Sequence, residues 1–307
     1  MTQREAIRNI LSDATDLDVV YDEPMSRYAS LKLGGKAAAL VAPHNEAALI
    51  RVVGILRKNG IAFLPVGNLT NLLVLDGGYP GVLVWMRTLD AVTASEVNGV
   101  FEISAQAGAP LARVAALAAS RELAGFECLA GIPGSVGGAI RMNAGAFGTD
   151  MQAITTCVEL LDADGTIKTL TRTEIPFSYR SCGLPADVLI TGARFALQKG
   201  DAAAIRAKMA EIMKWRQEKH PLRYPNAGSV FKNPPDLPAG RLIEELGLKG
   251  VRHGDAQISK QHANFIINKG RATAADVMAL IHLVQQKAKE EKGVSLEPEW
   301  AIIGEGI

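Results

Sequence analysis

Cysteine is scarce in this sequence of 307 residues, and long apolar or strongly basic segments are missing from it. The three cysteines, Cys128, Cys157 and Cys182, are odd in number and show no C-x-x-C spacing, which argues against a disulfide framework or a zinc site. No apolar run approaches the ~18 residues that span a bilayer. The N-terminal residues mix charges without an apolar stretch, which predicts no signal peptide. We therefore expect a soluble cytoplasmic protein.

Excess charge of either sign is also missing, because 33 Lys and Arg residues face 32 Asp and Glu residues, for a formal charge of +1. This balance lacks the electrostatic footprint of a nucleic-acid-binding protein. The five histidines show no metal-ligand spacing, so we predict no metal site. A chain of this length with 48% hydrophobic residues can bury a full core and is long for one domain. We expect two or three packed units that act on a small molecule.

Glycine is the residue that is concentrated, in the stretch from Gly131 to Gly148, which reads GIPGSVGGAIRMNAGAFG. Glycine destabilises regular elements by roughly 0.5–1 kcal/mol, so such a cluster indicates a backbone that approaches a flat or anionic ligand closely. The alternative is a glycine-rich surface loop. Pro133 and the interleaved apolar residues favour the ligand site over a flexible linker. The spacing matches neither the Rossmann fingerprint nor a phosphate-binding P-loop.

The N-terminal third reads as a strand over 36–43, a helix over 46–58 capped by Asn45, and a strand over 61–66. This βαβ pattern predicts a small parallel sheet. The second strand leads into Gly67-Asn-Leu-Thr-Asn-Leu-Leu73, a position where open α/β folds present backbone donors to phosphate. A plain turn satisfied by its own Asn and Thr side chains is the alternative.

Later segments change character. Asn98-Gly99 and Asp164-Gly165 each separate two strand-like runs and predict antiparallel hairpins. A helix that is capped by Asp201 and runs to about Lys219 begins a new unit. Its apolar side is expected to consist of Ile205, Met209, Ile212, Met213 and Trp215. Further along, a capping box at Thr273 predicts a long helix that ends at Gly293, and residues 296–304 predict a final strand.

Three side chains stand out as candidates for chemistry. Arg180 follows a strand-like run and could hold a carboxylate, or it is an exposed salt-bridge partner. Ser229 does not lie in a G-x-S-x-G elbow, so it is a proton donor by position or simply a turn residue. Glu299 lies within an apolar strand region, although a solvated sheet edge would also explain it.

Several segments resemble, in the same order, the UDP-N-acetylenolpyruvoylglucosamine reductases, flavoenzymes of bacterial cell-wall precursor synthesis. They are Leu33-Gly34-Gly35, the turn 67–73, Gly131–Gly148, Tyr179-Arg180, Asn226–Pro234, Gly254–Phe265 and Leu296–Glu299. The resemblance implies an α+β fold: an FAD-binding domain of the vanillyl-alcohol-oxidase/p-cresol-methylhydroxylase type, with two α+β subdomains, plus a C-terminal α+β substrate-binding domain. We expect these parts at 1–80, 81–198 and 199–307. The short connection after Arg180 resembles the subtype without a tyrosine-bearing substrate loop.

The resemblance also implies the cofactors FAD and NADPH and a UDP-sugar substrate. NADPH reduces FAD, and the flavin then transfers hydride to the enolpyruvyl group of UDP-N-acetylglucosamine enolpyruvate. Arg180 and Glu299 would stabilise the resulting enolate, and Ser229 would protonate it. The oligomeric state is not predicted.

The remaining site residues are carried over by the resemblance alone. The implied FAD contacts are Gly34, Gly35, Gly67, Asn68, Thr70, Asn71, Gly131, Ser135, Gly138, Ala139, Arg141, Asn143, Ala144 and Gly145. The implied contacts to the substrate diphosphate and uridine are Arg216, Lys219 and Asn233.

The sequence departs from the family pattern at a few positions. Leu69 and Thr70 replace the second glycine and the serine of the usual Gly-x-Gly-Ser-Asn turn, so a side chain is expected where bare backbone should approach the FAD pyrophosphate. Cys182 replaces a serine and Ala301 an arginine. These departures keep a flavin- or nucleotide-binding paralogue without turnover as an alternative. An FAD-linked oxidase with another substrate is a further alternative, against which Ser229 and Glu299 speak.

Overall fold

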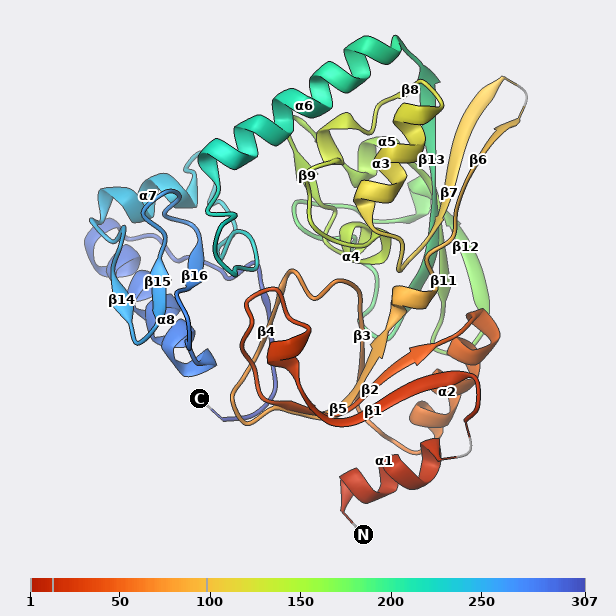
Figure 1. Cartoon of the computed structure of the whole chain (residues 1–307), viewed down its shortest axis with the longest axis horizontal. Coiled ribbons are helices and arrows are strands. Elements are labelled where there is room, and N and C mark those ends of the chain that lie inside the picture. Colours follow the sequence, from red (N-terminus) through yellow and green to blue (C-terminus); the bar gives the residue numbers. More distant parts are fainter. Residues whose placement is uncertain (1, 13, 98, 307) are drawn as a thin grey trace.

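The structure, a computed structural model, describes residues 2–12, 14–97 and 99–306. Three regions follow one another along the chain, and Figure 1 shows them as a first sheet at the bottom, a second sheet at the upper right and a C-terminal region at the left. Within the described residues, no helix combines the length and the apolar character needed to cross a membrane.

The first sheet has four strands in the order β1-β2-β5-β3. They are β1 (Leu17–Pro24), β2 (Lys36–Pro43), β5 (Tyr79–Trp85) and β3 (Phe63–Val66). β2, β5 and β3 are parallel, as the βαβ pattern predicts, and helix α2 (Glu46–Lys58) connects β2 to β3 with Asn45 as its cap. The sequence analysis missed β1, which pairs antiparallel with β2.

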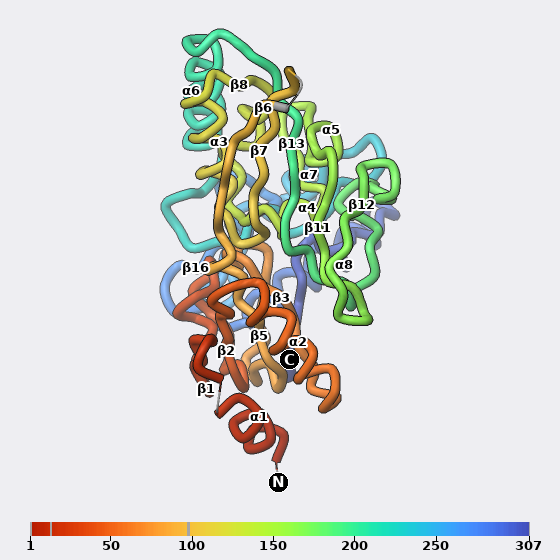
Figure 2. Tube along the Cα trace, turned by 90° about the vertical axis from the view of Figure 1, so that its right-hand side faces the viewer, coloured from red at the N-terminus to blue at the C-terminus, as the bar shows by residue number. Residues whose placement is uncertain are grey.

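The second sheet is antiparallel and lies above the first in Figure 2. Its order is β12-β11-β13-β7-β6, and a short strand also pairs with β13. The strands are β12 (Ile167–Thr171), β11 (Thr155–Leu161), β13 (Leu189–Lys199), β7 (Val100–Gln106), β6 (Val92–Val97) and β8 (Leu123–Ala124). Both predicted strand pairs, β6 with β7 and β11 with β12, are formed. Of the first predicted turn, Asn98 lies outside the described residues.

Short helices and turns complete the first two regions. The α-helices are α1 (Gln3–Leu11), α3 (Leu111–Ser120), α4 (Val136–Arg141) and α5 (Met151–Ile154). The 3-10 helices are η1 (Met25–Arg27), η2 (Met86–Thr88), η3 (Glu127–Leu129) and η4 (Arg172–Glu174), and a small hairpin joins β9 (Gly145–Ala146) to β10 (Thr149–Asp150). The glycine-rich stretch therefore contains α4, which packs against β13, and the strand β9.

Helix α6 (Ala202–Lys219) crosses from the second sheet to the C-terminal region (Figure 1). Asp201 caps it through a hydrogen bond from the Ala204 N–H, as predicted. Only Ile205 and Ile212 are buried, however. The prediction of one continuous apolar side is wrong at Met213 and Trp215, which are 40% and 41% exposed, because the second half of this helix spans the gap between regions instead of covering a core.

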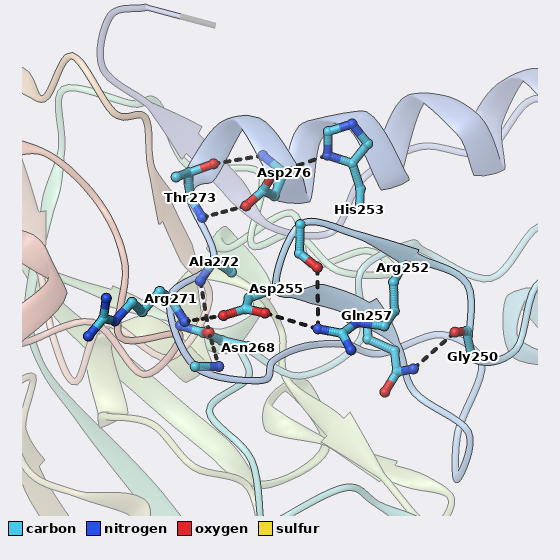
Figure 3. A network of polar contacts seen from close by, with 12 residues as sticks. Gly250, Arg252, His253, Asp255, Gln257, Asn268, Arg271, Ala272, Thr273 and Asp276 are labelled. Atoms are coloured by element: carbon cyan, nitrogen blue, oxygen red, sulfur yellow. Dashed lines mark hydrogen bonds and ion pairs between the residues drawn. The ribbon is translucent and has the colours of Figure 1, made fainter.

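The C-terminal region combines two helices with a three-stranded antiparallel sheet. Its elements are α7 (Ala239–Glu245), β14 (Arg252–His253), β15 (Ala256–Ile258), β16 (Ile266–Asn268) and α8 (Ala274–Lys292). The capping box at Thr273 and the left-handed Gly293 are both present at the ends of α8. Figure 3 shows how His253 contacts the capping carboxylate of Asp276, which fastens the sheet to the start of this helix.

The C-terminal region also returns to the N-terminal one. Strand β17 (Ala301–Ile303) pairs in parallel with β4 (Leu72–Val74), directly after the turn that follows β3. The carboxylate of Asp76 accepts hydrogen bonds from the first two N–H groups of α8 at 2.9 Å each. The predicted strand over 296–304 is thus shorter than expected, because Pro298 forms an isolated bridge to Phe231 instead.

The buried side chains form one large cluster and two smaller ones. The large cluster joins helices and strands of the first two regions into one core, and a second cluster fills the C-terminal region. The second cluster also includes Leu31, Leu33, Leu73 and Leu75, so the N-terminal region contributes to it. Of the expected parts 1–80, 81–198 and 199–307, the boundary at residue 80 falls inside β5 (Tyr79–Trp85), a strand of the first sheet, so we propose to place this boundary after β5. The first two parts share a core.

Candidate active site

Two turns that the sequence singles out lie against each other. The turn of residues 67–71 follows β3, and residues 131–135 lead into α4. The Thr70 hydroxyl donates a hydrogen bond to the Pro133 carbonyl at 2.8 Å. A Cβ on Gly67 would lie 2.0 Å from Ser135 Oγ, far inside contact distance. Residue 67 therefore has to be glycine for the turns to meet.

Both turns carry unused backbone donors. Among the described residues, the N–H groups of Asn68, Leu69 and Thr70 donate to no partner, and neither do those of Ser135 and Gly138. Backbone N–H groups gathered in a turn and at the start of a helix attract anions such as a pyrophosphate. The pair of turns therefore has the donors that a dinucleotide phosphate needs.

Leu69 does not obstruct this site. Its φ of 49° is the left-handed conformation that favours glycine, yet the residue is only 5% exposed. The side chain belongs to the third apolar cluster, with Met25, Leu40, Val74 and Leu83. The expectation that this side chain stands between backbone and pyrophosphate is wrong, because burial turns it into the core.

Cys182 and Ala301, the other departures, have packing roles or none at the site. Cys182 is 1% exposed and belongs to the largest apolar cluster. Ala301 is exposed and donates its backbone N–H to the Asn71 carbonyl within the β17–β4 pair.

Arg180 and Glu299 are brought together from opposite ends of the fold. Arg180 sits in a tight turn closed by two hydrogen bonds between Ser178 and Ser181, with a left-handed φ of 57°. Its Nε lies 2.9 Å from Glu299 Oε1. The two side chains are 21% and 16% exposed, so this pair is largely removed from water. An ion pair in such a setting is unlike an exposed surface pair, which contributes little.

Glu299 is an unusual carboxyl group because it is buried within reach of two cations. Burial raises its pKa above the ordinary glutamate value, and the positive charges of Arg180 and Lys232 act in the opposite direction. Lys232 itself pairs with Glu297 at 2.6 Å. Burial thus favours a protonated Glu299 that can donate a hydrogen bond, while the arginine sets how readily it ionises.

Ser229 is joined to this pair through the backbone. The Glu299 N–H donates to the carbonyl of Val230 at 2.7 Å, directly after Ser229. Gly228, at φ 76°, makes the turn that presents the serine. A cavity of ≈ 320 Å³ opens at the same place, with Ser229, Asn233 and His262 in its wall. The structure thus pairs Arg180 with Glu299 through their side chains and connects Ser229 to Glu299 through the backbone of Val230.

The buried Asn264 holds this segment, and the sequence analysis did not single it out. Its amide donates to the Phe231 carbonyl at 2.8 Å and accepts from the Phe231 N–H at 3.0 Å. The Val230 N–H donates to the Asn264 carbonyl. A polar amide between the apolar residues Ala263 and Phe265 was the available signal, since a buried amide requires partners.

Other predicted cofactor contacts have protein partners. Arg141 donates to the carbonyls of Leu184, Pro185 and Val188. The Asn143 amide donates to Asp150 and to the Ser178 carbonyl, so it supports the turn that carries Arg180.

Packing or backbone pairing accounts for further members of that set. A Cβ on Gly35 would lie 2.3 Å from the Asp76 carbonyl, and one on Gly34 would lie 3.0 Å from Val74 Cβ. The Ala144 N–H donates to the Ala139 carbonyl, and Gly145 starts the β9–β10 hairpin. The structure thus gives these residues scaffold contacts, while the turns 67–71 and 131–138 carry the open donors.

The predicted substrate contacts are divided between two places. Asn233 lies in the cavity wall, donates its N–H to the Tyr179 hydroxyl and accepts the Ala239 N–H with its side-chain oxygen. Arg216 packs on the glycine-rich stretch, since a Cβ on Gly131 would lie 2.6 Å from its Nε. Burial lowers the pKa of Arg216, and its Nε has no partner among the described residues. Lys219 is exposed at the end of α6.

Comparisons with known proteins point in one direction. Residues 37–171 match the family model described as an FAD binding domain, and residues 220–303 match the C-terminal domain of UDP-N-acetylenolpyruvoylglucosamine reductase. A relative of that name from Syntrophus aciditrophicus is 46% identical over 98% of this chain and 96% of its own length. One from Caldanaerobacter subterraneus is 45% identical over 92% and 93%.

A solved structure extends this likeness to three dimensions. The structure of UDP-N-acetylenolpyruvylglucosamine reductase from Thermus caldophilus is 34% identical, has a TM-score of 0.78 and covers 93% of this chain and 98% of that chain. The predicted α+β fold, an FAD-binding domain followed by a further domain, is therefore confirmed.

Proposed function

Because this chain belongs to the UDP-N-acetylenolpyruvoylglucosamine reductase family of oxidoreductases, we propose that it reduces UDP-N-acetylglucosamine enolpyruvate to UDP-N-acetylmuramate. The electron donor in this proposal is NADPH and the cofactor is FAD. The observation that carries the proposal is the largely buried Arg180–Glu299 pair at 2.9 Å, joined through Val230 to Ser229.

The two turns suit FAD. Gly67 and Ser135 approach so closely that no side chain fits between them, and the unused N–H groups of residues 68–70 and 135 could hold the pyrophosphate. Bound FAD would accept electrons from NADPH and deliver a hydride to the enolpyruvyl carbon. The chain's own residues would bind the cofactor, orient the substrate and manage charge and protons.

Arg180 and Glu299 are proposed to stabilise the enolate that forms when the enolpyruvyl group is reduced. The guanidinium supplies fixed positive charge, and its Nε lies 2.9 Å from Glu299 Oε1, so the two groups are held side by side. A protonated Glu299 adds a hydrogen-bond donor, and its raised pKa supports this form. Both groups are fixed before substrate arrives, which is the condition for effective electrostatic stabilisation.

Ser229 is proposed to give a proton to the enolate carbon. A hydroxyl is a weak acid, so this role depends on the position of Ser229. The turn at Gly228 precedes the serine, and the hydrogen bonds of Asn264 to Phe231 hold the chain after it. Arg216, Lys219 and Asn233 are proposed to bind the diphosphate and uridine of the UDP-sugar. The remaining donors of Asn233 and Arg216 support this assignment.

We further propose a cytoplasmic location, supported by the free state of all three cysteines and by a nucleotide-sugar substrate. A role in peptidoglycan precursor synthesis follows from the same substrate.

The proposal is tested by following the visible spectrum of the purified, FAD-loaded protein under anaerobic conditions. NADPH is expected to bleach the flavin, and the enolpyruvyl substrate is expected to restore its colour. The Ser229→Ala variant is expected to bleach at the wild-type rate and to recover colour ~10²–10⁴-fold more slowly, the range that general acid catalysis supplies. Equal slowing of both steps would contradict the role of Ser229. A protein that bleaches but never recovers with this substrate would contradict the proposed function.

A further inference from the structure

The peptide of Glu299 is held on both sides by different parts of the fold. Its N–H donates to the Val230 carbonyl at 2.7 Å, as described above. Its carbonyl accepts a hydrogen bond at 3.0 Å from the side-chain amide of Asn71, a residue 228 positions earlier in the chain. Asn71 also accepts the Ala301 N–H with its backbone carbonyl at 3.0 Å. Asn71 therefore bonds to Glu299 through its side chain and to Ala301, the first residue of β17, through its backbone.

This contact changes the interpretation of Asn71. The family resemblance groups it with the FAD contacts, because it ends the turn of residues 67–71. In the structure its side-chain nitrogen is directed at the Glu299 carbonyl, while its backbone N–H, like those of residues 68–70, donates to no partner among the described residues. The side chain of Asn71 thus serves the buried carboxyl group.

We propose that Asn71 is a positioning residue for Glu299: its side-chain amide holds the Glu299 backbone beside the turn of residues 67–71 and so helps to set the position of the carboxyl group. The inference rests on the proposed function, since it takes Glu299 as the group that stabilises the enolate. Asn71 then contributes to cofactor binding and to catalysis. Its backbone ends the turn that holds the cofactor, and its side-chain amide positions the Glu299 carboxyl group. The Asn71 amide thus adds to the Val230 hydrogen bond and the β17–β4 pairing in holding the Glu299 segment beside the turn.

The expected loss of rate in Asn71→Ala follows from how strongly catalysis depends on the position of Glu299. Without the amide, the Glu299 carbonyl loses its partner, while the Val230 bond and the β17–β4 pairing stay in place. The segment is then free to shift by a fraction of an ångström, and misplacement by ~1 Å reduces rates by on the order of 10²-fold. We expect Asn71→Ala to slow substrate-dependent flavin reoxidation by about 10–100-fold. Asn71→Asp keeps the shape but lacks the N–H donor, so it is expected to be slow as well.

Two further readouts separate positioning from cofactor binding. The FAD dissociation constant of the apoprotein, measured by flavin fluorescence, and the rate of flavin reduction by NADPH are both expected to stay within about threefold of wild type, because the backbone donors of residues 68–70 are untouched. The pH profile of reoxidation is expected to move upward, since a displaced Glu299 loses part of the Arg180 charge that lowers its pKa.

Asp76→Ala provides the matched control. Asp76 also joins the N-terminal region to the C-terminal one by side-chain hydrogen bonds to backbone, but it contacts the start of α8 and not Glu299. It is expected to lower thermal stability while both half-reactions keep wild-type rates. If Asp76→Ala slowed reoxidation as Asn71→Ala does, loosening of the junction would explain both variants, and the positioning role would be refuted.

The decisive experiment repeats Asn71→Ala in a Glu299→Ala background. If Asn71 acts through Glu299, the second substitution adds no further slowing, because the group that it positions is already gone. Additive losses, or a weakened FAD affinity, would refute the inference and return Asn71 to the cofactor site. If Glu299→Ala alone left reoxidation unchanged, the proposed role of Glu299 would fail instead, so the two failures are distinguishable.

Discussion

Leu69 has a left-handed backbone conformation that favours glycine, yet it carries a large side chain, so it tests whether side-chain burial outweighs backbone strain. Its φ of 49° is unfavourable for a residue with a Cβ by roughly 1–2 kcal/mol. Its side chain is 5% exposed within the third apolar cluster, and removing a buried leucine side chain to Cβ destabilises a protein by about 2–5 kcal/mol. Burial therefore outweighs the backbone strain, which explains why leucine is tolerated here.

The perturbation is a pair of substitutions, Leu69→Ala and Leu69→Gly. Alanine keeps the strain and loses the burial, so we expect the free energy of unfolding to fall by about 2–5 kcal/mol. Glycine loses the same burial but relieves about 1 kcal/mol of strain, so it is expected to be the more stable of the two by that amount. Urea unfolding of the apoproteins, with matched slopes, gives both differences.

FAD affinity is the second readout for these variants. Because the leucine side chain points into the core, neither substitution is expected to change the FAD dissociation constant by more than about threefold once the protein is folded. A large gain in FAD affinity for Leu69→Gly, with little loss of stability, would refute the reasoning. It would mean that the side chain does reach the pyrophosphate site.

Three further predictions follow from the site. Gly67→Ala places a Cβ 2.0 Å from Ser135 Oγ, so FAD affinity measured by fluorescence titration is expected to fall at least about tenfold. The double variant Gly67→Ala/Ser135→Gly lacks that oxygen and is expected to recover part of the affinity. An unchanged affinity in Gly67→Ala would contradict the close approach of the turns. Arg180→Met removes a charge that lowers the pKa of Glu299, so a stopped-flow pH profile of reoxidation is expected to shift to higher pH as well as to slow, and an unchanged profile would show that the pair is not coupled. Burial lowers the pKa of His220 to about 4, whereas its value in the unfolded chain is near 6.5. The wild type is therefore expected to lose stability as the pH falls from 6.5 toward 4, and His220→Phe is expected to lose less over this range in urea unfolding. An identical pH dependence in both proteins would exclude His220 as the source of the loss.

Local signals in the sequence predicted many individual elements. Asn45 and Asp201 cap helices at the predicted residues, and the capping box at Thr273 and the glycine at 293 delimit α8. These features depend on side chains that satisfy the free N–H groups of a helix start, so a few adjacent residues contain the information. The strand β1 contains the β-forming run Val19-Val20-Tyr21, which the sequence analysis overlooked among the neighbouring acidic residues, and it pairs with β2.

The site was predictable in its residue types but not in its contacts. The family resemblance named Arg180, Ser229 and Glu299 as a set, and the Arg180–Glu299 pair and the backbone bond from Glu299 to Val230 agree with it. Whether Leu69 faces the core or the cofactor depends on packing that the turn sequence does not encode. The Asn71 contact to Glu299 joins residues 228 positions apart and requires the whole fold.

The pairing of β17 with β4 also sets an order of events during biosynthesis. The turn of residues 67–71 leaves the ribosome early, yet among the described residues β4, the strand that follows it, pairs only with residues 301–303. N-terminal units generally fold first during synthesis, but here the last part of the chain has to return across more than two hundred residues to brace the cofactor turn. A nascent chain therefore presents the glycine-rich stretch before its partner turn is secured. A variant that lacks residues 301–303 is therefore expected to bind FAD more weakly, because β4 then has no partner strand beside the turn of residues 67–71.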